Sequence, residues 1–122
     1  MSPDEVGHIH AHGLATRSCD IDEAKAIREV FGAAADRVPV TAAKSYFGNL
    51  GAGSGMIELI ASVLALGKGT LFPILNFETP DPECPIKAAA PGNGAASPGS
   101  SFLNLSVTPQ GQASGVLVRA MG

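Results

Sequence analysis

Apolar and polar positions in the first half of the chain predict a strand, a helix and a second strand. The apolar pattern of residues 6–12 is typical of a short strand. Asp20 predicts a helix N-cap, and Glu23, three residues later, occupies the reciprocal position of a capping box. A helix with one apolar face is then expected over residues 21–31. The β-branched run of residues 37–43 predicts a second, buried strand.

The second half of the chain begins with a glycine-rich stretch that opens another helix. This helix is expected from about Gly53 to Leu66, and it is apolar almost all round, with Glu58 as its only charge. Such a pattern predicts a central helix that is buried on all sides. The remaining pattern predicts a third strand at residues 70–77, a flexible low-complexity loop at 86–101, and a hairpin of two strands at 102–108 and 114–119.

Strands and helices that alternate in this order predict a layered α/β domain. We expect a mixed five-stranded sheet, because the last two strands form an antiparallel hairpin. The 122 residues suffice for one domain with its own core, so residues 1–122 are interpreted as a single domain. Because the first strand begins almost at once, this domain is expected to be a fragment of a longer chain.

Composition and charge exclude several classes of partner. The formal net charge is −3 and no basic cluster is present, which argues against nucleic acid and against an anionic membrane surface. The longest apolar stretch, residues 56–66, is too short for a membrane span, which needs about 20 residues. The polar N-terminus does not resemble a signal peptide, and two distant cysteines suit free thiols in a reducing compartment. A cytoplasmic location is therefore expected.

The stretch HIHAHG places His8, His10 and His12 at every second position. On a strand these side chains share one face, so they could bind a transition metal. They would nevertheless stand almost 7 Å apart, and no acidic or cysteine ligand is evident nearby. A partly exposed strand with incidental histidines is a second interpretation, and catalysis by one histidine is a third.

The context of the motif favours catalysis by His12. This residue ends a strand just before Gly13, and α/β folds place their working side chains at the carboxyl ends of strands. The end of the next strand is followed by Lys44 and Asn49. A histidine and an asparagine at neighbouring strand ends could donate hydrogen bonds to one thioester oxygen. A nucleotide loop is disfavoured, because neither GxGxxG nor GK[ST] is present.

Three segments of the chain together resemble a known enzyme family. They read SPDEVGHIHAHGLAT, AKSYFGNLGAGSGMIE and PILNFETPDPECP. Their order and spacing are similar to those in the C-terminal half of β-ketoacyl-[acyl-carrier-protein] synthases, which are thiolase-fold condensing enzymes. The resemblance runs from about residue 2 to residue 85, and it implies layered elements in the order β-α-β-α-β-β.

The resemblance implies roles for individual residues. His12 matches the histidine that works on the thioester or malonyl group, and Lys44 matches a lysine that pairs with the helix glutamate, here Glu58. Asp20 and Glu23 match acidic residues with a structural role. His8 and His10 match no catalytic position, so both are interpreted as structural. The resemblance implies no cofactor and no metal.

The chain departs from the family pattern at three points. Neither cysteine matches the family's nucleophile, which lies in the N-terminal half. The second catalytic histidine of the family is Asn49 here. The glycine–phenylalanine segment NSFGFGGTNA is replaced by residues 104–113, of which only Asn104 and Ala113 remain.

The expected function is the His/Asn side of a site for decarboxylative condensation of malonyl and acyl thioesters, in fatty acid or polyketide synthesis. The expected partners are an acyl carrier protein, the N-terminal half of the same protein, and a second subunit in a homodimer or heterodimer. Alone, the chain is expected to be inactive and to expose the surface that the other half covers. Two alternatives stay open: an impaired partner subunit resembling chain-length factors, and a metal-binding domain.

Overall fold

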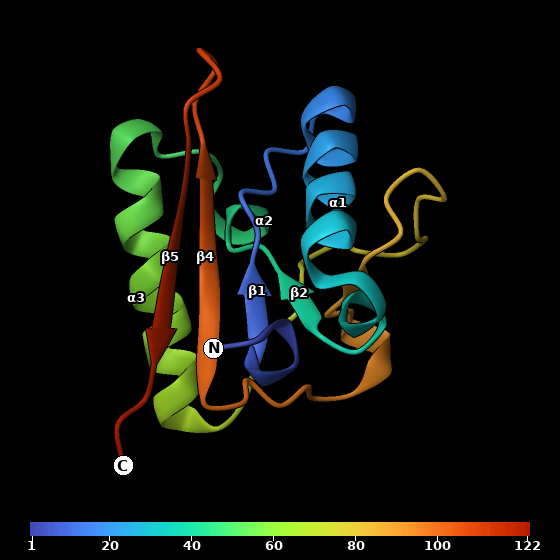
Figure 1. Cartoon of the computed structure of the whole chain (residues 1–122). Coiled ribbons are helices and arrows are strands. Elements are labelled where there is room, and N and C mark those ends of the chain that lie inside the picture. The colour runs from blue at the N-terminus through green and yellow to red at the C-terminus, as the bar shows by residue number, and fades with distance from the viewer.

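The five strands of the chain form one mixed sheet in the order β3-β2-β1-β4-β5 (Figure 1). The computed structural model describes the backbone of residues 1–122 and all side chains except that of Asn93. The strands are β1 (His8–His10), β2 (Pro39–Thr41), β3 (Lys87–Ala88), β4 (Ser101–Val107) and β5 (Ala113–Arg119). The C-terminal hairpin therefore lies within one residue of the predicted positions.

The strand β1 is parallel to both of its neighbours, β2 and β4. Strand β3 continues the parallel arrangement beside β2, while β4 and β5 pair antiparallel. This confirms the predicted layered α/β class with a mixed five-stranded sheet. Because β1, β2 and β4 run in the same direction, their carboxyl ends meet at one edge.

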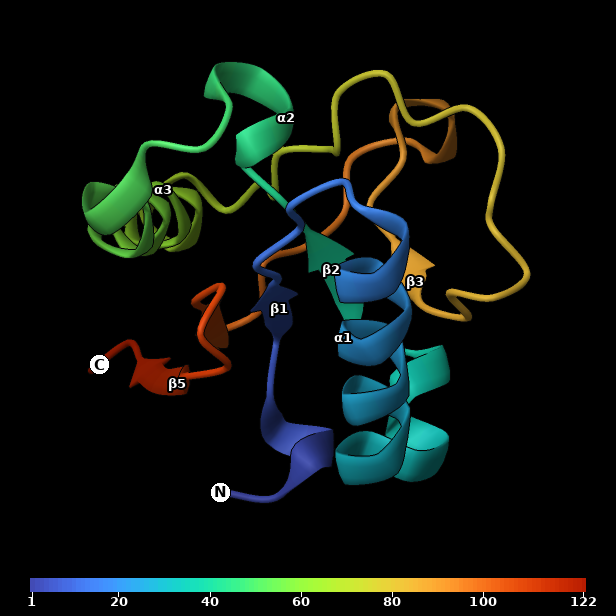
Figure 2. The same cartoon turned by 90° about the horizontal axis from the view of Figure 1, so that it is seen from above.

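Helices cover both faces of the sheet. The main helices are α1 (Arg17–Phe31) and α3 (Ser54–Lys68), and α2 (Lys44–Phe47) is a single turn after β2. Four short 3₁₀ segments complete the helical elements: η1 (Pro3–Glu5), η2 (Gly32–Asp36), η3 (Gly51–Gly53) and η4 (Pro91–Asn93). Figure 2 shows α1 and α3 on opposite sides of the sheet.

The two faces of the sheet differ in chemistry. Under α1 the core is apolar, and Ile9 and Val40 of the sheet pack there with Ile27 and Phe31 of the helix. Because side chains alternate along a strand, His8 and His10 point to the other face, where they meet α3. The histidines of the motif are therefore part of a buried polar layer.

The predicted start of the first helix was wrong. Helix α1 begins at Arg17 with Thr16 as its N-cap, and Asp20 lies inside the first turn, where its backbone N–H donates to Thr16 O. Glu23 closes no capping box, because its carboxylate accepts hydrogen bonds from the backbone before the helix. Gly32 is the C-cap, as predicted.

The strand predicted at residues 70–77 does not form. Only Leu71 makes a bridge, and its partner is Ala96. Pro73 lacks the N–H that a strand ladder requires, and Asn76 turns the chain with a φ of +61°. The third parallel strand is instead β3, which comes from the segment 86–101 that was predicted as a loop.

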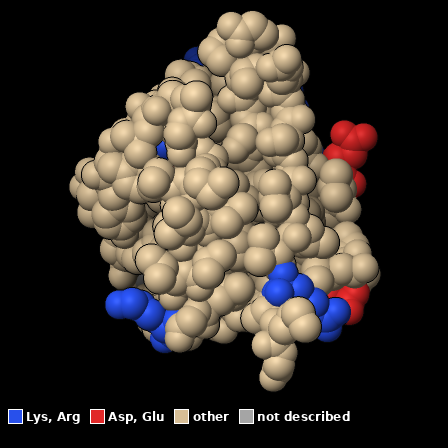
Figure 3. Space-filling view, turned by 90° about the vertical axis from the view of Figure 1, so that its left-hand side faces the viewer, with Lys and Arg blue, Asp and Glu red and all other residues tan. Residues whose placement is uncertain are grey.

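Helix α3 is not buried on all sides, which corrects the prediction of a central helix. One face packs on the sheet and buries Glu58, Ser62 and Ala65. The opposite face, here called the outer face of α3, exposes large apolar side chains: Met56, Ile57, Ile60, Val63 and Leu64, each 43–63% exposed. Figure 3 shows this side of the molecule, where most of the surface is uncharged and most charged side chains lie toward the lower and right-hand edges. Among the described helices, none combines the length and apolar character that a membrane crossing requires.

Candidate active site

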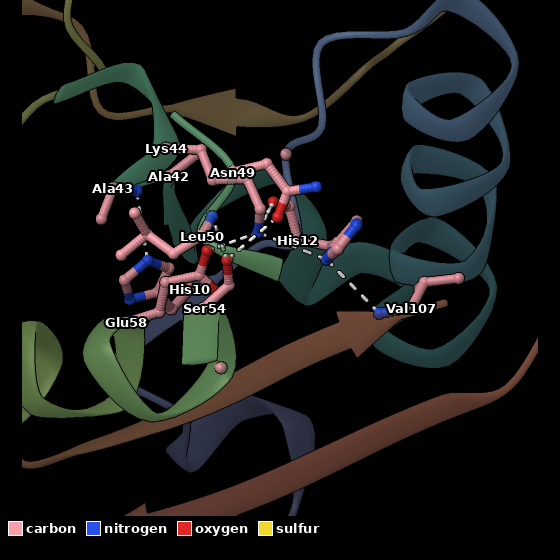
Figure 4. A network of polar contacts seen from close by, with 12 residues as sticks. His10, His12, Ala42, Ala43, Lys44, Asn49, Leu50, Ser54, Glu58 and Val107 are labelled. Atoms are coloured by element: carbon pink, nitrogen blue, oxygen red, sulfur yellow. Dashed lines mark hydrogen bonds and ion pairs between the residues drawn. The ribbon is translucent and has the colours of Figure 1, made fainter. Parts of the chain in front are cut away.

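Three parallel strand ends bring the candidate residues together. His12 lies two residues beyond β1, Lys44 lies three residues beyond β2, and Val107 is the last residue of β4. Because these strand ends share one edge of the sheet, residues far apart in the sequence become neighbours. Figure 4 shows the resulting network of polar contacts.

Lys44 is the centre of this network. Its ammonium forms an ion pair with the carboxylate of Glu58, donates a hydrogen bond to His12 O at 2.7 Å, and lies 3.4 Å from His12 Nδ1. The side chains of Lys44 and Glu58 are only 4% and 0% exposed. Charges buried this deeply require a partner, so the pair ties α2 to α3.

The contacts of His12 determine which ring nitrogen carries the proton. Nδ1 faces two groups at 3.4 Å, the ammonium of Lys44 and the backbone N–H of Val107. Both groups can only donate, so Nδ1 accepts and the proton resides on Nε2. Burial, followed by the positive charge of Lys44, lowers the pKa of His12. The imidazole is therefore neutral, with an Nε2–H that points away from both donors (Figure 4).

The loop that carries His12 is held by Glu23. The carboxylate accepts hydrogen bonds from His12 N at 2.7 Å and from Gly13 N at 3.0 Å. Burial raises the pKa of Glu23, although these two hydrogen bonds oppose that effect. Gly13 has a φ of +54°, and a Cβ at this position would stand 2.7 Å from the Cβ of Ala42. The glycine thus lets the loops after β1 and β2 approach closely.

The side-chain amide of Asn49 has a fixed orientation. Its Oδ1 accepts hydrogen bonds from Gly51 N at 3.1 Å and from Ser54 Oγ at 3.0 Å. Because the backbone N–H of Gly51 can only donate, the amide nitrogen must point the other way and remains available as a donor. Asn49 and Lys44 line a cavity of about 540 Å³ between α1 and the loop of residues 74–86. His12 does not line this cavity and makes no described hydrogen bond to Asn49.

The remaining predicted residues lie around this network. Asp20 lines the same cavity, and burial raises the pKa of its carboxyl group. Asn104 stands opposite His10 in the register of β4 and β1, and its amide donates to Gly55 O in the first turn of α3 at 3.2 Å. Neither residue makes a described hydrogen bond to His12, but the charge of Asp20 opposes the lowering of the His12 pKa.

Sequence reasoning missed Val107 and Ser62. Val107 lies in the segment of residues 104–113 that replaces the family's glycine–phenylalanine motif, yet its N–H contacts His12. Ser62 hydrogen-bonds to both His8 and His10. For Ser62, its occurrence as a polar residue within a largely apolar helix was the only feature of the sequence that could have indicated this role. No described group of three or more His, Cys, Asp or Glu side chains is arranged to hold a metal ion.

Comparison with known proteins places the chain beside condensing enzymes. Residues 1–78 match the family model described as the β-ketoacyl synthase C-terminal domain. The chain is 40% identical over 86 residues to the 3-oxoacyl-[acyl-carrier-protein] synthase 2 of Synechocystis sp., covering 70% of this chain and 21% of the relative. A putative polyketide β-ketoacyl synthase 1 of Streptomyces cyaneus is 38% identical over 86 residues, covering 70% and 20%.

Solved structures match over the entire chain. A ketosynthase in complex with its type II PKS acyl-carrier protein superimposes with a TM-score of 0.92 and 35% identity, covering 100% of this chain and 30% of that one. The ishigamide ketosynthase/chain length factor gives a TM-score of 0.90 and 27% identity, with the same coverage. These neighbours confirm the thiolase-like half-domain.

The chain spans about a fifth of the curated relatives it matches and 30% of these solved chains. Its matched segment contains the loop of His12, the pair of Lys44 and Glu58, and Asn49. By sequence and by fold, the chain belongs to the family of β-ketoacyl synthase C-terminal domains.

Proposed function

We propose that this chain supplies the His12 and Asn49 side of an active site for decarboxylative condensation of malonyl and acyl thioesters. The observation that carries the proposal is that two donors contact Nδ1 of His12, so that the proton of the neutral imidazole resides on Nε2. A neutral N–H donor suits a developing negative charge on a thioester oxygen.

The proposed chemistry follows from the available donors. Loss of CO₂ from a malonyl thioester leaves an electron pair on the adjacent carbon, and the resulting enolate places negative charge on the thioester oxygen. His12 Nε2–H and Asn49 Nδ2–H would donate to this oxygen. The enolate carbon then attacks the carbonyl of an acyl group held on a cysteine outside this chain, and the thiolate leaves. Asn49 can donate a hydrogen bond but cannot shuttle a proton.

The proposed partners follow from the same chemistry. The substrates would arrive on an acyl carrier protein in the cytoplasm. The name of one neighbour describes a type II PKS acyl-carrier protein in complex with its ketosynthase, which supports this partner. The outer face of α3 would pack against the half of the condensing enzyme that contributes the cysteine. The complete enzyme would be a homodimer or heterodimer.

A second candidate function is a partner subunit that shapes the pocket without condensing. Asn49 in place of a histidine favours it, and so does the similarity to a ketosynthase/chain length factor. In that case Asn49 would line the cavity without taking part in the reaction, and the second subunit would perform the reaction.

A chimera separates the two candidates. The 86 aligned residues of this chain replace their counterparts in the Synechocystis synthase, and release of CO₂ from malonyl thioester is measured together with condensation. We expect CO₂ release that falls by about 10²–10³ in His12→Ala and in Asn49→Ala. Glu29→Ala, on an exposed position of α1, is the control and keeps full activity.

Two results would contradict the proposal. One is CO₂ release that persists unchanged in His12→Ala. The other is a folded chimera that is inactive until Asn49→His restores the reaction, which would favour the partner subunit.

A further inference from the structure

Two histidines of the HIHAHG motif have no place in the proposed reaction. His8 and His10 are both 0% exposed, and their side chains point from β1 toward α3. An imidazole buried so completely is costly unless its ring nitrogens have hydrogen-bond partners. The partners of these two rings form one continuous chain of contacts.

The chain of contacts runs from Pro98 to Ala43. His8 Nδ1 lies 2.8 Å from Pro98 O, and His8 Nε2 lies 3.0 Å from Ser62 Oγ. The same hydroxyl lies 2.8 Å from His10 Nδ1, and His10 Nε2 accepts from Ala43 N at 3.1 Å. All four ring nitrogens are therefore engaged, and none is left to ligate a metal.

The two end groups of this chain of contacts, Pro98 O and Ala43 N–H, determine the position of every proton between them. Pro98 O can only accept, so His8 Nδ1 carries a proton, and in a neutral ring Nε2 then accepts from the hydroxyl of Ser62. Ala43 N–H can only donate, so His10 Nε2 accepts and His10 Nδ1 carries the proton. That proton is donated to Ser62 Oγ. Each donor thus meets an acceptor, with both histidines neutral and protonated on Nδ1.

We propose that His8, Ser62 and His10 form a directed hydrogen-bond relay that fixes the backbone of Ala43, and that His10 is thereby a positioning residue for Lys44. Ala43 directly precedes Lys44, whose ammonium contacts both Glu58 and His12. Helix α2 begins at Lys44, and Ala43 is its N-cap. The backbone N–H that donates to His10 therefore lies between the end of β2 and the start of that helix.

The surroundings of the relay favour neutral rings. The groups that act on the ring of His10 are its titratable neighbour His8, the ammonium of Lys44 and the backbone of Glu58 on α3, the last of which opposes the effect of the other two. Burial first, and then His8 and Lys44, lower the pKa of His10 to about 3. Phe102 stacks on His8 and Phe72 meets His10 edge-on, so apolar rings close the layer.

The tautomers can be measured directly. Long-range ¹H–¹⁵N spectra of the histidine-labelled 122-residue chain report which ring nitrogen is protonated. We expect both His8 and His10 as neutral Nδ1–H forms at neutral pH. Either ring protonated on Nε2, or charged on both nitrogens, overturns the relay. This measurement requires no variant and no activity, so its outcome is independent of the proposed reaction.

The positioning role is tested through the titration of His12. If His10→Ala releases Ala43, Lys44 moves away and the pKa of His12 rises, since Lys44 helps to lower it. In His10→Asn the carboxamide can accept from Ala43 N–H and donate to Ser62, so the pKa of His12 returns to the wild-type value. Ser62→Ala removes only one oxygen, and it gives the same rise as His10→Ala.

Thr41→Val provides the matched control. Thr41 is 0% exposed on β2, and its hydroxyl donates to Phe72 O at 2.7 Å, so the variant also loses one buried hydrogen bond. It should lower stability while leaving the titration of His12 unchanged. A wild-type pKa of His12 in both His10→Ala and Ser62→Ala, or an equal rise in Thr41→Val, overturns the positioning role.

Discussion

Lys44 contacts a single histidine twice, at its backbone and at its ring. The ammonium donates to His12 O at 2.7 Å and lies 3.4 Å from His12 Nδ1, while Glu58 balances its charge from α3. A fixed cation beside an imidazole disfavours a second positive charge on the ring. The ammonium of Lys44 is therefore part of what keeps His12 neutral, although the carboxylate of Glu58 opposes this effect, and the buried pair also joins two elements of the fold.

Removing one member of this pair is expected to be strongly destabilising. Lys44→Met leaves the carboxylate of Glu58 buried without its cation, and Glu58→Leu leaves the ammonium of Lys44 without its anion. Each single variant should lower the free energy of unfolding by about 3–5 kcal/mol, measured by urea denaturation. The double variant should recover much of this loss, because no uncompensated charge remains. Single losses below about 1 kcal/mol would contradict the importance of the pair.

Glu23 is expected to control the order of the loop that carries His12. Glu23→Ala removes the acceptor for His12 N–H and Gly13 N–H, so it should cost about 1–3 kcal/mol and speed hydrogen exchange at these two amides. Glu29→Ala, also on α1 but exposed, should change neither quantity. Unaltered exchange at both amides in Glu23→Ala would show that the loop is held by other contacts.

Gly13 and Gly32 form a matched pair for testing close approach. Both have a φ of +54°, but a Cβ on Gly13 would meet Ala42 at 2.7 Å, whereas a Cβ on Gly32 would meet nothing within 4 Å. Gly32→Ala should cost about 1–3 kcal/mol for backbone strain alone, because its φ of +54° and ψ of −127° lie outside the regions that alanine favours. Gly13→Ala should cost about 1–3 kcal/mol more, because the loops after β1 and β2 must separate. Equal losses in thermal or urea unfolding would exclude a tight contact at Gly13.

The buried histidines predict that stability falls as the pH is lowered. The pKa of His10 is lowered from 6.5 to about 3, so between these values the unfolded chain binds a proton that the folded chain does not. The free energy of unfolding should therefore decrease below about pH 6.5, by up to about 1.4 kcal/mol per pH unit for each such proton. The lowered pKa values of His8 and His12 act in the same direction.

Two carboxyl groups oppose this trend at lower pH. Burial raises the pKa of Asp20 and of Glu23, so the folded chain takes up their protons before the unfolded chain does. Urea denaturation at about pH 7.5 and about pH 5.5 compares conditions in which the histidines dominate. His10→Asn should show a smaller difference between the two conditions than Thr41→Val. An equal difference in both variants would mean that His10 does not contribute.

The outer face of α3 predicts self-association of the isolated chain. Its apolar side chains are 43–63% exposed, and contiguous apolar surfaces of this kind associate in water. Light scattering should show a mass that rises with concentration, together with binding of an apolar dye. Ile60→Glu should reduce both, whereas Val30→Glu, at a 67% exposed position on α1, should not. A wild-type chain that stays monomeric and binds no dye would contradict this prediction.

Much of the fold was predictable from local patterns. The hairpin of β4 and β5 has a clear turn between two β-prone runs, and α1 has one apolar face and a C-terminal glycine. The third strand was not predictable, because β3 has only two residues and lies in a segment of small residues without periodicity. Its pairing with β2 decides its conformation, and local propensity does not.

The candidate site was predictable only where the residue type carries the chemistry. His12, Lys44 and Glu58 could be identified from the sequence, and the structure connects them. Val107 could not, because it contributes a backbone N–H, which every residue except proline has. The start of α1 was misplaced for a related reason. Asp20 and Glu23 fit a capping box, but the carboxylate of Glu23 instead binds the backbone of the loop before the helix.

The two faces of helix α3 differ: one buries polar side chains against the sheet, and the other exposes apolar side chains. Toward the sheet it holds Glu58 and Ser62, on which both the lysine pair and the histidine relay depend. On its outer face, the apolar side chains of Ile57, Ile60 and Val63 are exposed. Because both sets of side chains belong to the same helix, a tilt of α3 would also move Glu58 and Ser62 in the buried polar layer. If a partner packs on the outer face of α3, as proposed above, its fit would therefore also affect the positions of Glu58 and Ser62.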